Sequence, residues 1–89
     1  MKIKEGFDLR RIGNENIIVA RGMENIHFGS IISMNSSAAW LWEQVASEEF
    51  DEKRLAGLLL SKYAIDMETA RQDAREIAEQ WLTAGIVEG

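Results

Sequence analysis

The chain is 89 residues long, carries a formal net charge of −5 at pH 7, and is 46% hydrophobic and 28% charged. A domain of this size holds one core and leaves little room for an enclosed catalytic cavity. Cysteine is absent, which excludes disulfides and thiolate metal sites, and no apolar run approaches the roughly 20 residues that span a bilayer. We expect one domain over residues 1–89, located in the cytoplasm, without a membrane partner.

The acidic excess lies in the C-terminal part of the chain. Residues 1–34 contain five Lys and Arg against four Asp and Glu, whereas residues 35–89 contain five against eleven. Nucleic-acid binding depends on clustered cations that neutralise phosphates. The charge distribution therefore argues against DNA or RNA as the main partner.

The first third of the chain alternates short β-favouring runs with turn residues. FDLRRI (7–12), IIVA (17–20) and IISM (31–34) are typical of strands, and a Gly/Asn turn separates the first two. A longer connection, GMENIHFGS, precedes the third run. The pattern predicts a three-stranded antiparallel sheet.

From Asn35 onward the apolar residues recur at helical spacing. Asn35, Asp51 and Asp66 are natural N-caps for three successive helices, and Gly85 is a typical C-terminal stop. The third helix carries the cleanest apolar stripe, formed by Met67, Ala70, Ala74, Ile77, Ala78, Trp81 and Leu82. The sequence predicts an α+β fold in which the sheet covers a cluster of three helices, followed by a short extended tail at Ile86–Glu88.

Few residues are suited to catalysis. His27 is the only histidine, so the chain offers neither a two-histidine metal site nor a second imidazole for proton relay. The serines at 30, 33, 36 and 37 fit turns and helix caps, and no glycine-rich segment has phosphate-binding spacing. We expect no enzymatic activity, no cofactor and no metal.

Trp40 lies on the face of the first predicted helix opposite the core-facing residues Leu41 and Trp42. It either packs over a neighbouring loop or the N-terminal strand, or it is an exposed anchor for a partner or a second copy.

A row on one flank of the third helix is a candidate groove wall. Its members follow i, i+4, i+7, i+11 spacing and are Arg71, Arg75, Ala78 and Leu82. The two arginines could grip a ligand, or they could form ordinary surface ion pairs with Glu68 and Glu79.

The predicted strand IISM lacks the proline or charge that usually blunts a sheet edge. If this strand lies at the edge, its free backbone groups could capture an extended peptide. The protein's own chain or a second copy could cover the same edge instead.

Three stretches together resemble one known family. They are IISMNSSAAWLWEQV (31–45), FDEKRLAGLLLSKYAID (50–66) and ETARQDAREIAEQWLTAGIVEG (68–89). In order and spacing they are similar to the pyrroloquinoline quinone biosynthesis protein D (PqqD-like) family of peptide-recognition domains. The resemblance covers most of the chain, from about Phe7 to Glu88.

The resemblance implies a winged helix-turn-helix-like fold without catalytic activity. Members bind the leader segment of a ribosomally made precursor peptide between the third strand and the third helix, and they present it to a modifying enzyme, often a radical S-adenosylmethionine (radical SAM) protein. On this sequence the peptide-binding residues would be Ile31, Ile32, Ser33 and Met34 on the strand, with Arg71, Arg75, Ala78 and Leu82 on the helix. The stretches do not specify a pathway, and lasso-peptide or thioether-peptide maturation fits as well as pyrroloquinoline quinone synthesis.

Two alternatives stay open. A winged-helix DNA-binding regulator could use Arg71, Gln72 and Arg75 for base contacts, although residues 66–83 carry five acidic side chains against two arginines. A self-associating module could instead form a homodimer through Trp40 and the IISM edge.

Overall fold

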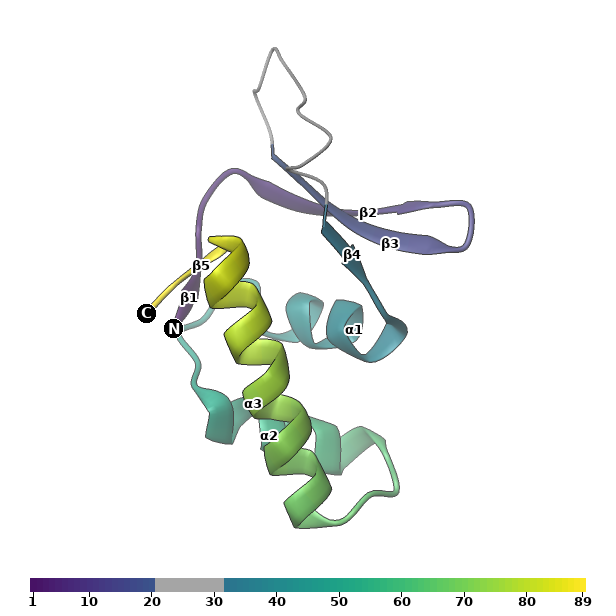
Figure 1. The fold of residues 1–89 in the computed structure, drawn as a ribbon, viewed down its shortest axis with the longest axis vertical. Coiled ribbons are helices and arrows are strands. Elements are labelled where there is room, and N and C mark those ends of the chain that lie inside the picture. The colour runs from purple at the N-terminus through teal and green to yellow at the C-terminus, as the bar shows by residue number, and fades with distance from the viewer. Residues whose placement is uncertain (21–31) are drawn as a thin grey trace.

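A computed structural model describes residues 1–20 and 32–89. It contains a three-stranded antiparallel sheet in the order β2-β3-β4 and three helices that follow it in the chain (Figure 1). The elements are β2 (Phe7–Ile12), β3 (Glu15–Ala20), β4 (Ile32–Met34), α1 (Ser36–Gln44), α2 (Glu52–Lys62) and α3 (Met67–Ala84). The predicted α+β class, with three strands before three helices, is confirmed.

Strands β2 and β3 form a tight hairpin in which Ile12 pairs with Glu15. The two residues between them include Gly13, whose φ of 63° suits the first central position of a type II′ turn. Strand β4 pairs antiparallel with β3 and matches Ile18 with Ile32. This pairing leaves β4 at one edge of the sheet.

Side chains of β4 alternate between the two faces of the sheet. Met34 is buried and Ile32 is half-buried, whereas Ser33 is exposed. Ile32 lies opposite Ile18, which is completely buried in the core. Ile32 and Met34 therefore face the helices, and Ser33 faces away from them.

All four predicted helix boundaries are confirmed. The side chains of Asn35, Asp51 and Asp66 each accept a hydrogen bond from the backbone N–H three residues later, at 2.7–2.8 Å. At Asp66, hydrogen bonds from the side chain and backbone of Thr69 lower the pKa of the carboxyl group below its ordinary value. Gly85 ends α3 in the left-handed conformation, with a φ of 74°.

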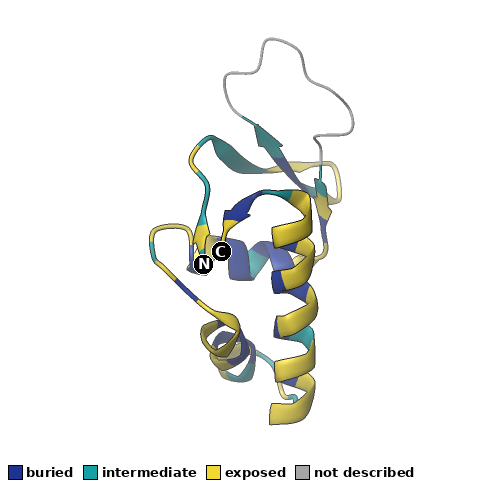
Figure 2. Ribbon diagram, turned by 60° about the vertical axis from the view of Figure 1, so that its left-hand side comes forward, coloured by how far each residue is buried: buried dark blue, intermediate teal, exposed yellow. Residues whose placement is uncertain are grey.

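Buried residues from the sheet and from all three helices form one core (Figure 2), and Trp81 of α3 belongs to it. The rings of Trp42 and Phe50 meet Trp81 edge-on, with centroids at 5.3 and 5.9 Å. Most of the predicted α3 stripe is buried, but Met67 and Leu82 are 56% and 44% exposed. These two lie near the helix ends, where the apolar face extends beyond the elements that cover the rest of it.

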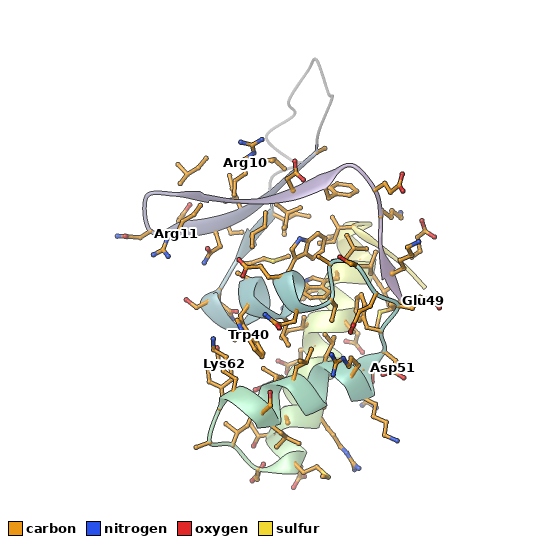
Figure 3. The ribbon with its side chains drawn as sticks, turned by 180° about the vertical axis from the view of Figure 1, so that it is seen from behind. Arg10, Arg11, Trp40, Glu49, Asp51 and Lys62 are labelled. Atoms are coloured by element: carbon orange, nitrogen blue, oxygen red, sulfur yellow. The ribbon has the colours of Figure 1, made fainter. Side chains whose placement is uncertain are left out.

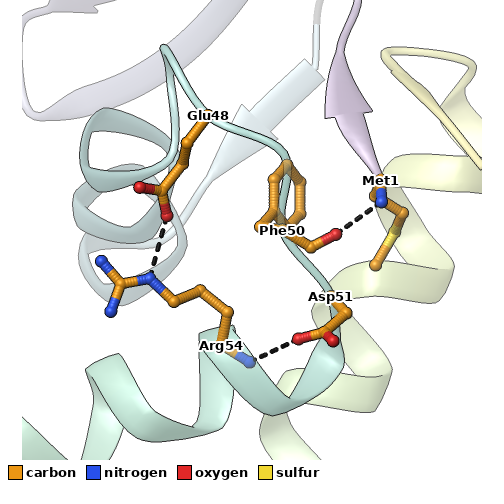
Figure 4. A network of polar contacts seen from close by, with 5 residues as sticks. All are labelled: Met1, Glu48, Phe50, Asp51 and Arg54. Carbon is orange, nitrogen blue, oxygen red and sulfur yellow. Dashed lines mark hydrogen bonds and ion pairs between the residues drawn. The ribbon is translucent and has the colours of Figure 1, made fainter.

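Two further strands join the ends of the described chain, and the sequence did not predict their pairing. Strand β1 (Lys2–Ile3) pairs antiparallel with β5 (Val87–Glu88), so that Ile3 lies opposite the buried Val87. Met1 and Phe50 exchange two backbone hydrogen bonds beside this pair (Figure 4). The predicted extended tail is thus part of a small second sheet.

Candidate functional site: a groove beside the edge strand

The outer edge of β4 borders a groove. No other strand of the described chain pairs with that edge. The groove has a volume of about 360 Å³ and lies between β4, the start of α1, the end of α2 and one side of α3. Its lining residues from the two principal walls are Ile32, Ser33 and Met34 of β4 and Asp73, Glu76, Ile77, Gln80 and Trp81 of α3.

The described lining of the groove combines apolar residues with two acidic residues of α3. Tyr63 and Ile65, from the end of α2 and the turn that follows it, contribute apolar surface together with Ile77. Asp73 and Glu76 are the charged residues among the lining side chains, and neither lies within ion-pair distance of a cation in the described chain. The groove can therefore hold an extended apolar chain and can attract positive charge on the α3 side.

The predicted arginine row does not face β4. Arg71 and Arg75 line a different groove, about 790 Å³ in volume, between α2 and α3. Ala78 is buried in the core. Leu82 is exposed and is not among the described lining residues of either groove. Neither arginine forms an ion pair within the described residues, so the alternative pairing with Glu68 and Glu79 is not observed either.

The arginines lie away from β4 because the core stripe of α3 has two flanks, and the arginines lie on the flank that turns toward α2. At about 100° per residue, Arg71 and Arg75 lie on one flank, and Asp73, Glu76 and Gln80 lie on the other. A helical wheel identifies both flanks equally well. Only tertiary packing decides that the flank with Asp73 turns toward β4 and the flank with the arginines turns toward α2.

Comparison with known proteins gives a match over residues 10–87 to the family described as Coenzyme PQQ synthesis protein D (PqqD). The chain belongs to the PqqD family. No curated protein matches it. This bears out the resemblance found in the three sequence stretches.

The PqqD-family chain also shares its fold with a solved structure, TbiB1 in complex with the TbiA(beta) leader peptide. The TM-score is 0.73, the sequence identity is 16%, and the match covers 100% of this chain and 96% of TbiB1. At this identity the likeness concerns the fold, including the sheet and three helices that enclose the groove.

In this PqqD-family chain Trp40 is half-buried against the C-terminal end of α2. Its ring meets Tyr63 edge-on at 6.4 Å, and Lys62 Nζ lies 4.5 Å from its centroid (Figure 3). Trp40 thus packs where α2 meets the connection to α3, beside Tyr63, a residue of the groove lining. Its proposed role in an interface stays a prediction.

The other residues named from the sequence either line the groove or lie outside the described residues. Ile32, Ser33 and Met34 line the groove, and their role in peptide binding stays a prediction, whereas Ile31 and His27 lie outside the described residues. Among the described residues, no group of three or more His, Cys, Asp or Glu side chains could hold a metal ion. None of the described helices is long and apolar enough to cross a membrane.

Sequence reasoning missed the acidic groove wall of the PqqD-family chain. Asp73, Glu76, Ile77 and Gln80 follow i, i+3, i+4, i+7 spacing, the same kind of signal that singled out the arginines. Two carboxylates on an acidic helix are ordinary surface residues on sequence grounds. Their position opposite an edge strand distinguishes them, and that position is a tertiary property.

Proposed function

We propose that this PqqD-family chain is a non-catalytic peptide chaperone. It binds the leader segment of a ribosomally made precursor peptide as an added strand along β4. It then presents that peptide to a modifying enzyme such as a radical SAM maturase.

The observation that carries the proposal is the edge of β4 beside the groove, with which no described strand pairs. Exposed N–H and C=O groups at a sheet edge can pair with an extended peptide, and a groove next to the edge can receive every second side chain. The structurally similar TbiB1 was solved with a leader peptide bound, which supports the same class of ligand for this chain.

The alternation of β4 defines which peptide side chains enter the groove. Peptide residues opposite Ile32 and Met34 extend toward the helices, and the residue opposite Ser33 extends away. We therefore expect a bound leader to show period-two selectivity, with alternate residues apolar.

A scan of backbone N-methylation tests the strand-addition mode. The probes are fluorescein-labelled leader peptides from short precursors encoded beside this gene, each N-methylated at one residue. In an added strand only every second N–H faces β4, so anisotropy titrations should show loss of affinity at alternate positions. Affinity loss without alternation, or no binding by any of these leaders, would contradict the proposal.

Two further experiments test the proposed partners, which are a second copy of the chain and the modifying enzyme. A second copy of the chain could pair with the same edge, so sedimentation with and without peptide should show that any homodimer dissociates as the leader binds. If dimers persist unchanged with peptide bound, they use a different surface. In a reconstituted reaction with the neighbouring modifying enzyme, omission of this chain should slow modification of the precursor, and an unchanged rate would contradict the presentation role.

A further inference from the structure

We propose that the leader segment selected by this groove carries a lysine or arginine that binds Asp73 and Glu76. This inference rests on the proposed function and names the chemistry of its ligand. The expected peptide has apolar residues at alternate positions and one cationic side chain directed at α3.

The charges in the described lining of the groove are all negative. Of the described residues that line it, none is Lys, Arg or His, and the charged ones are Asp73 and Glu76. An acidic peptide side chain at this wall would meet two like charges, whereas a cationic one would meet two opposite charges. The two carboxylates therefore favour a cationic peptide side chain over an acidic one.

Both carboxylates are available to a ligand. They lie three residues apart on α3, so they project from the same side of the helix. Asp73 is half-buried, and neither side chain has a hydrogen bond or ion pair to another residue of the described chain. A ligand cation can therefore bind both without first displacing an internal partner.

Apolar residues line the groove together with the two carboxylates. Tyr63, Ile65 and Ile77 line the same groove as Asp73 and Glu76. Lysine and arginine bury their methylene stems on such surface and keep the charged end at a polar rim. The groove thus suits a long cationic side chain better than a short polar one.

The groove between α2 and α3 shows that a lining with acidic residues and no cations is not common to every face of α3. It combines the cations Lys53, Arg71 and Arg75 with Glu52 and Glu68. Only the wall that faces β4 presents carboxylates without cations in its described lining.

A matched pair of double variants tests the inference. Asp73→Asn with Glu76→Gln removes both charges from the groove wall. Glu68→Gln with Glu79→Gln makes the same change in net charge at exposed α3 positions outside this groove. The probes are the fluorescein-labelled leaders of the neighbouring precursors, and versions in which each Lys or Arg is singly replaced by Gln.

The expected result is selective loss of affinity. The groove variant should bind the leader about three- to tenfold more weakly than wild type, because partly exposed charge pairs contribute about that much to a binding constant. The control variant should bind within about twofold of wild type. One cationic residue of the leader should matter in wild type and lose its effect in the groove variant, which a double-mutant cycle measures.

Several outcomes would overturn the inference while the proposed function stands. These are unchanged or tighter binding by the groove variant, equal weakening by both variants, and a peptide cation whose replacement has the same effect in both proteins. If no leader binds wild-type protein at all, the proposed function itself fails and the inference fails with it. Thermal unfolding of all variants shows that they are folded during the titrations.

Discussion

Substitutions of two glycines, one inside α2 and one at the C-cap of α3, distinguish the effect of backbone conformation from that of an added methyl group. Gly85 has a φ of 74°, whereas Gly57 lies inside α2, and a Cβ atom at either position would meet nothing within 4 Å. We expect Gly85→Ala to lower the free energy of unfolding by about 1 kcal/mol, because L side chains are strained in the left-handed region. Gly57→Ala should raise it by about 0.5–1 kcal/mol, because alanine favours the helix. Urea unfolding measures both.

Each glycine variant is the control for the other, since both add one methyl group in open space. Shifts of the same sign would show that the methyl group itself, rather than the backbone conformation, determines the effect. Gly57 lines the groove between α2 and α3, so Gly57→Ala should leave affinity for the leader unchanged if the peptide binds beside β4.

Local chemistry explains which residues could be assigned from sequence. Asn35, Asp51 and Asp66 cap helices through contacts with their own next turn, and Gly85 ends α3 through its own φ angle. Such interactions depend on a few neighbouring residues and are visible in the sequence. Asp73 lines the groove together with β4, some 40 residues earlier in the chain, and no local rule predicts that proximity.

At the scale of one element, α1 carries two tryptophans with different surroundings. Trp42 is 4% exposed and packs edge-on against Trp81, whereas Trp40 is half-buried against Tyr63 and Lys62. We expect Trp42→Ala to lower the free energy of unfolding by about 3–5 kcal/mol through loss of core packing. Trp40→Ala should cost about 1 kcal/mol, the scale of one aromatic contact and one exposed cation–π contact.

Chemical unfolding followed by circular dichroism measures both variants. A loss of 3–5 kcal/mol is a large part of the stability of a domain of this size, so Trp42→Phe, with a smaller expected loss, keeps the comparison measurable. Equal losses at the two positions would contradict the assignment of Trp42 to the core and Trp40 to the periphery.

How well each element could be predicted from sequence depends on whether the signal for it lies within its own segment. The three helices and β2, β3 and β4 each contain a period or a cap that is complete within the segment. Strands β1 and β5 are two residues long and carry no period, and they exist because Ile3 and Val87 meet across the whole chain. The orientation of α3 about its own axis is likewise set by α2 and the sheet, so the sequence alone does not tell which flank of α3 lies beside β4.

At the scale of the whole molecule, the β1–β5 pair connects distant parts of the chain away from the groove. Val87 is 3% exposed in the core, Glu88 beside it is exposed, and neither lines the groove beside β4. We expect Val87→Ala to lower the free energy of unfolding by about 1.5–3 kcal/mol, from lost burial and the cavity left behind. Glu88→Ala is the matched control and should stay within about 0.5 kcal/mol of wild type.

The same variants test whether stability and recognition are separable in this fold. Because β5 does not contribute to the groove, Val87→Ala should keep the leader-peptide affinity of wild type under conditions in which both proteins are folded. Urea unfolding and anisotropy titration on the same preparations give the two quantities. A Val87→Ala protein with weakened binding would show that the β1–β5 pair holds α3 in its position relative to β4, and the groove would then depend on contacts at the far end of the helix.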